Sequence, residues 1–171
     1  MDARAKLFGH PIHQMLIVFP LGLLGMSVIF DVVHLATDEA VFSVVAYWML
    51  VAGLVGGFLA APFGFLDYRG IPAGTRAKRV GALHGGGNLV VTLLFLASAL
   101  IRGDDAAVPP SGAYLCSFAG FLLALITAWL GGELVDRLGV GVHENANLDA
   151  PSSLRDSHAG SHAGRQARVG S

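Results

Sequence analysis

The stretch that decides the fold is residues 44–66, VVAYWMLVAGLVGGFLAAPFGFL, which contains no charged side chain. A helix of about 20 apolar residues crosses the roughly 30 Å of hydrocarbon in a bilayer. Three further stretches share this apolar character, and they run from about residue 15 to 35, 83 to 101 and 113 to 135. Because helices satisfy their own backbone hydrogen bonds in lipid, the sequence predicts four transmembrane helices.

The composition also indicates a membrane protein. Of 171 residues, 54% are hydrophobic and 13% are charged, and the mean hydropathy is +0.63. Soluble domains carry roughly 25% charged residues, and small ones leave much of their surface in water. The net charge of −1 offers no basic surface to nucleic acid, so no such partner is expected. The single cysteine, Cys116, excludes an internal disulfide.

The connections between the apolar stretches are short and polar, which favours antiparallel neighbours. We therefore expect an all-α membrane protein, an up-down bundle of four transmembrane helices over residues 15–137. Residues 1–14 form a short N-terminal segment. Residues 138–171 are expected to form a mostly disordered tail, because they carry little apolar surface. His158 and His162 lie there in a repeated Ser-His-Ala-Gly, which favours a solvated tail over weak metal binding.

Basic residues predict the orientation, because loops rich in Lys and Arg stay in the cytoplasm. On one side of the expected bundle Arg102 is the single basic residue. The other basic residues flank the opposite side: Arg4, Lys6, Arg69, Arg76, Lys78, Arg79, Arg137, Arg155, Arg165 and Arg168. Both termini are therefore expected in the cytoplasm, with the bundle in a bacterial inner membrane. We expect the first apolar run to be retained, because it is longer than a signal peptide and has no clear cleavage site.

Ionisable residues inside spans are costly in lipid, so each suggests a function or a specific partner. Asp31 follows His13 by 18 positions, which is five helical turns and places both on one face. Arg102 follows His84 by the same 18 positions, and Asn88 shares that face. We expect Asp31 and Arg102 to form a polar pair near the outer interface. Ordinary interfacial placement of each is the alternative.

A histidine cluster is expected at the cytoplasmic face, where His10, His13 and His84 converge from two spans. Two imidazoles can hold haem b axially, and His13 and His84 are the expected ligands, with Asn88 beside them. Three glycines after His84 would let a flat ligand approach the backbone. A transition metal held by His10, His13 and His84 is the alternative to haem. Any one of these histidines taken singly is better explained by helix capping or backbone hydrogen bonding.

Small residues recur along two spans, and such stripes let membrane helices pack closely. The stripes are Gly53, Gly57, Ala60 and Gly64 in the second span and Gly120, Ala124, Ala128 and Gly132 in the fourth. We expect them to pack within the bundle. Contact with a second copy or with a partner membrane protein is the alternative.

Residues 9–22, GHPIHQMLIVFPLG, resemble the opening motif of a bacterial membrane-protein family without an assigned activity, "domain of unknown function 2231". His84, the Gly131-Gly132 pair and residues 139–142, GVGV, extend the resemblance over about residues 7–143. The family is similar to four-helix b-type cytochromes, which implies haem ligation by His10, His13 or His84. The chain departs from the pattern at Gln14, where many members carry proline, and at Val18, where many carry histidine.

The sequence supports four functional classes to different degrees. A redox protein that binds haem b or a metal is favoured, followed by a non-catalytic membrane subunit or regulator that binds partner helices. A transporter is disfavoured, because the spans show no evident internal repeat and no polar residue at mid-membrane. An enzyme is also disfavoured, since no Ser-His-Asp or Gly-x-Ser-x-Gly arrangement is evident.

Overall fold

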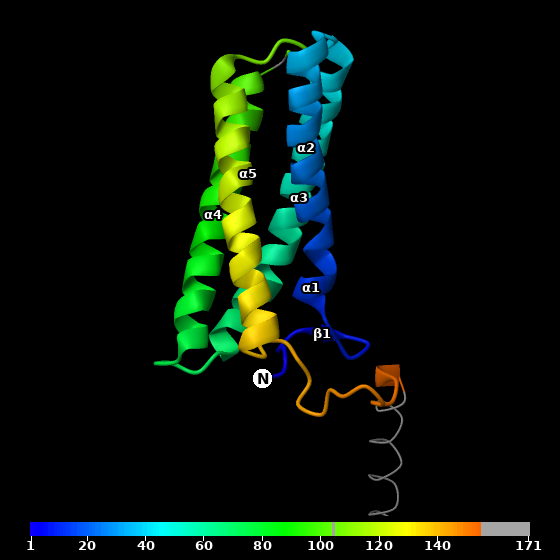
Figure 1. Cartoon of the computed structure of the whole chain (residues 1–171), viewed down its shortest axis with the longest axis vertical. Helices are drawn as coiled ribbons and strands as arrows, with labels where there is room; N and C mark the ends of the chain where they lie inside the picture. The colour runs from blue at the N-terminus through cyan, green and yellow to red at the C-terminus, as the bar shows by residue number, and fades with distance from the viewer. Residues whose placement is uncertain (104, 155–171) are drawn as a thin grey trace, which may run out of the picture.

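The computed structural model describes residues 1–103 and 105–154 (Figure 1). In chain order the elements are β1 (Lys6–Leu7), β2 (His10–Pro11), α1 (Ile12–Leu16), α2 (Val18–Thr37), α3 (Ala40–Gly70), α4 (Arg76–Arg102), α5 (Ser111–Gly132) and a π-helical turn, η1 (Glu133–Arg137). Within the described residues, four segments are long and apolar enough to cross a membrane: Ile12–Thr37, Ala40–Gly70, Arg76–Arg102 and Ser111–Arg137. The predicted all-α membrane bundle is confirmed.

The helices extend beyond the predicted apolar cores, because polar residues continue or cap them. At the start of α4 the hydroxyl of Thr75 accepts a hydrogen bond from the backbone nitrogen of Lys78 at 3.1 Å. This cap moves the first residue of α4 to Arg76. Between α2 and α3 the chain reverses at Asp38, whose φ of 60° is a left-handed conformation that Asp tolerates.

The four helices form two hairpins that stand side by side (Figure 1). The first hairpin packs α1 and α2 against α3, and the second packs α4 against α5. We call the end that carries the N-terminus and η1 the terminal end, and the opposite end the distal end. Both α2 and α4 run from the terminal end to the distal end. This shared direction places His13 and His84 at one end of the bundle and Asp31 and Arg102 at the other.

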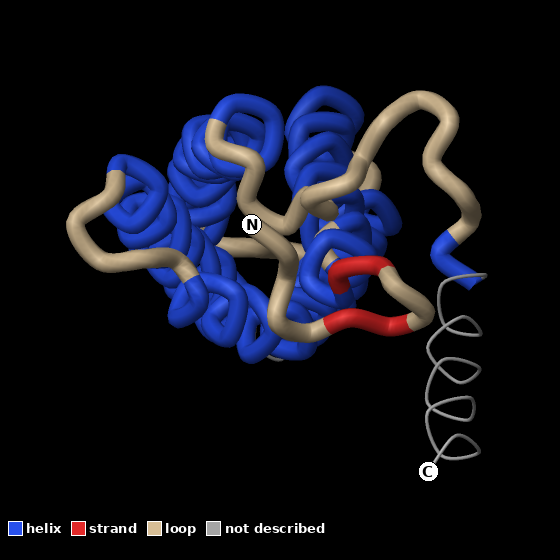
Figure 2. Tube along the Cα trace, turned by 90° about the horizontal axis from the view of Figure 1, so that it is seen from below, coloured by secondary structure: helices blue, strands red, loops and turns tan. Residues whose placement is uncertain are grey.

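The N-terminal segment runs across the terminal end, as the view from below shows (Figure 2). Strands β1 and β2 pair antiparallel, with Lys6 opposite Pro11. The backbone nitrogen of Arg4 donates to Oδ1 of Asp67 at 2.6 Å, which ties the segment to α3. The backbone nitrogen of Met1 donates to the carbonyl oxygen of Gly139 at 3.0 Å, which ties it to the chain after η1.

A core shared by the two hairpins holds them together. Its fully buried side chains are Leu50 of α3 and Phe95 of α4, and Val28, Leu54 and Val91 pack around them. The outward faces are also apolar: Trp48 is 64% exposed and Leu100 is 72% exposed. An apolar exterior of this kind is the surface that a bilayer covers.

The predicted tail divides into two parts. Ser153 lies beside the N-terminal hairpin, where its hydroxyl donates to the carbonyl oxygen of Phe8 at 3.0 Å. The backbone nitrogen of Ala146 donates to the carbonyl oxygen of His143 at 3.0 Å, which closes a turn. Residues 155–171, with His158 and His162, lie outside the described residues, so the prediction of a disordered, solvated tail there stays a prediction, with weak metal binding as its alternative.

Candidate functional site

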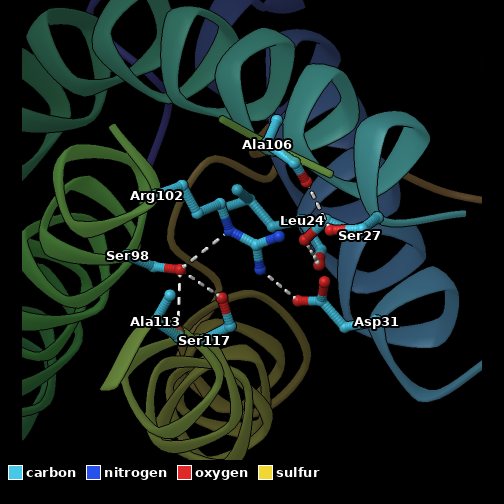
Figure 3. A network of polar contacts seen from close by, with 9 residues as sticks. Leu24, Ser27, Asp31, Ser98, Arg102, Ala106, Ala113 and Ser117 are labelled. Carbon is cyan, nitrogen blue, oxygen red and sulfur yellow. Dashed lines mark hydrogen bonds and ion pairs between the residues drawn. The ribbon is translucent and has the colours of Figure 1, made fainter. Parts of the chain in front are cut away.

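Asp31 and Arg102 form an ion pair inside the distal half of the bundle (Figure 3). The guanidinium Nη2 lies 2.6 Å from the carboxylate Oδ2, and both side chains are 0% exposed. The pair that the sequence suggested thus bridges α2 and α4 in the interior, away from the lipid. Breaking such a pair leaves an unpaired charge in a medium of low dielectric constant, so each residue depends on the other.

Buried hydroxyl groups lie around the ion pair, and that of Ser98 contacts Arg102. Four fully buried serines contribute from all four helices: Ser27, Ser43, Ser98 and Ser117. The Ser98 hydroxyl lies 2.7 Å from that of Ser117 and 3.5 Å from Nε of Arg102 (Figure 3). The ring of Tyr114 lies 5.5 Å from the guanidinium carbon of Arg102, within range of a cation–π contact. This polar cluster joins the two hairpins at the distal end.

His13 occupies a socket on α3 at the terminal end. Its Nδ1 lies 3.0 Å from the carbonyl oxygen of Ala60. A Cβ on Gly64 would lie 2.8 Å from Cε1 of His13, closer than real Cβ contacts allow. In an α-helix, the side chain four residues further along lies over a backbone carbonyl. Gly64 has no side chain, so the carbonyl of Ala60 is open to the imidazole of His13. We call Ala60, Gly64 and His13 the first socket.

His84 occupies a matching socket on α5. Its Nδ1 lies 2.9 Å from the carbonyl oxygen of Thr127. A Cβ on Gly131, four residues after Thr127, would lie 3.0 Å from Cε1 of His84. The amide Nδ2 of Asn88 lies 3.2 Å from Nε2 of His84, and the Thr127 hydroxyl donates to Oδ1 of Asn88 at 2.9 Å. We call Thr127, Gly131 and His84 the second socket.

These contacts assign the same tautomer to both imidazoles. A carbonyl oxygen only accepts, so Nδ1 of His13 and of His84 carries the hydrogen. In the neutral form of each ring, Nε2 then holds a lone pair. This is the form in which an imidazole binds a metal, with the other nitrogen oriented by a backbone carbonyl.

His10 does not join this pair. It lies on β2, where its Nδ1 is 3.3 Å from the carbonyl oxygen of Phe8 and 3.4 Å from the hydroxyl of Ser153. Over residues 1–103 and 105–154, no three His, Cys, Asp or Glu side chains come together as a set that could hold a metal ion. The hairpin β1–β2 is the physical reason, because it turns His10 toward the residues after η1.

The two acidic residues expected near the histidines have partners elsewhere at the terminal end. Asp67 accepts the backbone nitrogens of Arg4 and Ala5. Glu133 pairs with Arg76 at 2.6 Å, which holds η1 against the start of α4. Both carboxylates therefore fasten the terminal end of the bundle.

The small-residue stripes pack largely inside the bundle, as expected. A Cβ on Gly53 would lie 2.7 Å from Leu24 of α2, and one on Gly120 would lie 3.1 Å from Phe95 of α4. Gly64 faces His13, as described above. The stripes thus hold each hairpin together.

Sequence reasoning missed several residues of these sites. The sequence pattern assigns no role to Thr127, which supplies both a carbonyl to His84 and a hydroxyl to Asn88. It marks Gly64 as a packing residue and Gly131 as a family residue, whereas the structure shows both as openings for imidazoles. A hydroxyl residue in an apolar span indicates a buried polar contact, because buried hydroxyls need hydrogen-bond partners. Thr127 and the serines could have been found in this way.

Comparisons with known proteins identify the family. A search of curated proteins and a search of solved structures each found no match. A family model described as "Predicted membrane protein (DUF2231)" matches residues 9–144. This range includes both sockets and the ion pair, and it agrees with the resemblance carried by residues 9–22. The chain therefore belongs to the DUF2231 family of predicted membrane proteins.

Proposed function

We propose that this membrane protein binds haem b at its terminal end, where Nε2 of His13 and of His84 would hold it, and that it has a redox role. The observation that carries the proposal is the shared tautomer of the two imidazoles. Each ring donates Nδ1–H to a backbone carbonyl and directs a basic Nε2 away from it. When bound, haem would supply one-electron chemistry.

The surroundings of the two histidines fit a flat anionic group. Gly85 and Gly86 follow His84, and a Cβ on either would have no described atom within 4 Å. Side chains of Arg69 and Arg79 are exposed at the same end and supply positive charge for propionates. The site is therefore open beside His84 and basic at its rim.

We also propose that the terminal end faces the cytoplasm of a bacterial cell, with the bundle in the inner membrane. The support is the excess of Lys and Arg at this end. Reporter fusions after residue 103 and after residue 154 test the orientation. Opposite locations for the two reporters support it, with the fusion after residue 154 in the cytoplasm, and the reverse contradicts it.

An absorption spectrum tests haem binding. The protein is purified in mild detergent from haem-replete cells and measured before and after dithionite. We expect a Soret band and a reduced α-band that are lost in His13→Ala and in His84→Ala, while His10→Ala retains them. A haem-free spectrum from folded, monodisperse wild-type protein would overturn the proposal. Metal analysis of that sample would then test whether it holds a metal ion in place of haem.

One observation favours a second candidate, a non-catalytic membrane subunit or regulator. Nε2 of His84 already has a partner in Asn88, and its Nδ1 bonds the carbonyl oxygen of Thr127, so the histidine also serves to fasten α4 to α5. In this case the partner is another membrane protein or a second copy of the chain. The expected result is a haem-free protein in which His84→Gln retains the fold and copurifies with the same partner.

A further inference from the structure

Equivalent positions recur in α1–α2 and α4 at a constant spacing. His84, Ser98 and Arg102 each lie 71 positions after a counterpart (84 less 13, 98 less 27, 102 less 31). The counterparts are His13, Ser27 and Asp31. Both histidines bind a backbone carbonyl, both serines are fully buried, and the last two positions form the ion pair.

The second helix of each hairpin repeats as well, at a spacing of 67. Residues 46–64, AYWMLVAGLVGGFLAAPFG, align with residues 113–131, AYLCSFAGFLLALITAWLG. Six of the nineteen aligned positions are identical. The identical residues are Ala46, Tyr47, Ala52, Gly53, Ala61 and Gly64, with Ala113, Tyr114, Ala119, Gly120, Ala128 and Gly131 as their counterparts.

The contacts repeat with the residues. Gly53 packs against Leu24, and the counterparts of these two residues, Gly120 and Phe95, also pack against each other. In the sockets, Ala60 and Gly64 correspond to Thr127 and Gly131 by the spacing of 67, while their histidines correspond by 71. The same contacts made by two independently placed helices indicate one structural unit used twice.

The relation between the two hairpins is a two-fold rotation about an axis along the bundle. The equivalent helices α2 and α4 run in the same direction, which excludes an inverted repeat. Asp31 touches its own counterpart, Arg102. A position meets its own equivalent where a two-fold axis passes, so the axis runs between these two side chains. At the terminal end it separates the equivalent histidines.

We infer that the chain is a tandem repeat of one helical hairpin, and that the two sockets are the halves of a single ligand site on the pseudo-two-fold axis. The expected ligand is a flat metal complex that accepts one imidazole from each repeat. This second half of the inference rests on the proposed function. Each socket leaves the Nε2 of its imidazole on the side away from the backbone carbonyl, so one histidine from each repeat would hold such a ligand.

Asn88 is the residue that makes the two halves unequal. Its counterpart in the first repeat is Ile17 (88 less 71), whose side chain has no donor for Nε2 of His13. The amide of Asn88 binds the Nε2 of His84 that a ligand needs. Asn88 is thus a positioning residue that holds His84 in its socket and competes with the ligand.

A charge exchange tests the repeat without any ligand. Asp31→Arg places two arginines at the axis, and Arg102→Asp places two aspartates there, so each single change lowers the melting temperature by roughly 10 °C or more. The double variant is expected to melt within a few degrees of the wild type, because equivalent positions have equivalent surroundings. A double variant that misfolds, or that is no more stable than the single ones, would overturn the tandem repeat.

Haemin titration of the full chain tests the shared site. Asn88→Ile gives the second repeat the residue of the first, and we expect haemin to bind about threefold to tenfold more tightly, since a competing hydrogen bond is lost. If Asn88→Ile acted only by loosening the fold, haemin would bind more weakly instead. Ile17→Asn is the matched control and is expected to weaken it.

The outcomes separate the two proposals. Haemin binding that is unchanged by Asn88→Ile, or that needs only one of the two histidines, contradicts the shared site and leaves haem binding itself in place. A wild-type chain that binds no haemin overturns the proposed function together with the shared site. The charge exchange then still decides whether the repeat exists.

Discussion

Asp31 and Arg102 occupy equivalent positions of two repeats and meet 2.6 Å apart with no exposure. Two separate copies of one hairpin would place identical residues there, and two like charges in a buried site repel strongly. Within a single chain the two positions are free to differ. Their opposite charges then attract, so the buried pair both joins the hairpins and requires that each repeat has its own sequence.

Removing one member of this pair should destabilise the bundle. Arg102→Ala leaves the Asp31 carboxylate buried without a counter-charge, and we expect the free energy of unfolding to fall by about 3–5 kcal/mol. Thermal unfolding in mild detergent, followed by circular dichroism, measures this. The double variant Asp31→Leu with Arg102→Met removes both charges and should lose much less. Equal losses in the single and double variants would show that the pair does not act as a unit.

Alanine at the socket glycines should move the imidazoles with little change in stability. A Cβ at residue 64 would displace the ring of His13 from the carbonyl oxygen of Ala60. The lost hydrogen bond, about 1 kcal/mol, is roughly offset by the helix propensity of alanine. Nitrogen-15 NMR of labelled histidine should show the loss of the Nδ1–H hydrogen bond in Gly64→Ala, and likewise for His84 in Gly131→Ala.

Gly132→Ala is the matched control for the socket variants. A Cβ there has no described atom within 4 Å, so the histidine signals should stay unchanged. A shift of the His84 signals in Gly132→Ala as large as in Gly131→Ala would contradict the assigned role of Gly131.

Close helix packing at Gly53 predicts a loss of stability on substitution. A Cβ there would lie 2.7 Å from Cδ2 of Leu24 and 3.2 Å from its backbone nitrogen, and the backbone cannot yield as a side chain does. Overpacking of this kind costs about 1–3 kcal/mol. Thermal unfolding of Gly53→Ala measures it. Gly22→Ala has open space around its Cβ and should melt at or above the wild-type temperature.

The N-terminal segment should loosen at acid pH. The Lys6 ammonium, 2.8 Å from the carboxylate, lowers the pKa of Asp2 below its ordinary 3.8 by hydrogen bonding. A lowered pKa means that this contact stabilises the segment above pH 3.8, and that the contribution is lost as the pH falls through the folded-state value. NMR titration of Asp2 should show its pKa rising toward 3.8 in Lys6→Met. Lys6→Arg should keep it low, and a low pKa retained in Lys6→Met would contradict the assignment.

The sequence predicted which residues of the sites share a helix face, but not which helices bring them into contact. Spacings of 18 residues predicted that His13 shares a face with Asp31 and His84 with Arg102, because helical periodicity fixes which residues share a face. The contact between Asp31 and Arg102 depends on how α2 and α4 cross, which no local pattern encodes. The repeat of residues 46–64 was legible in the sequence, but two different spacings, 71 and 67, obscured it.

The sequence by itself determined that this is a four-helix membrane protein, since length and hydropathy are properties of each segment alone and the bilayer acts on each segment alone. It also determined the family, through residues 9–22. Only the tertiary structure decided that His13 and His84 hold matching tautomers in sockets opened by Gly64 and Gly131, and that His10 turns away from them. Those features arise where helices distant in the chain touch, and such contacts are set by close packing and hydrogen bonding across the bundle.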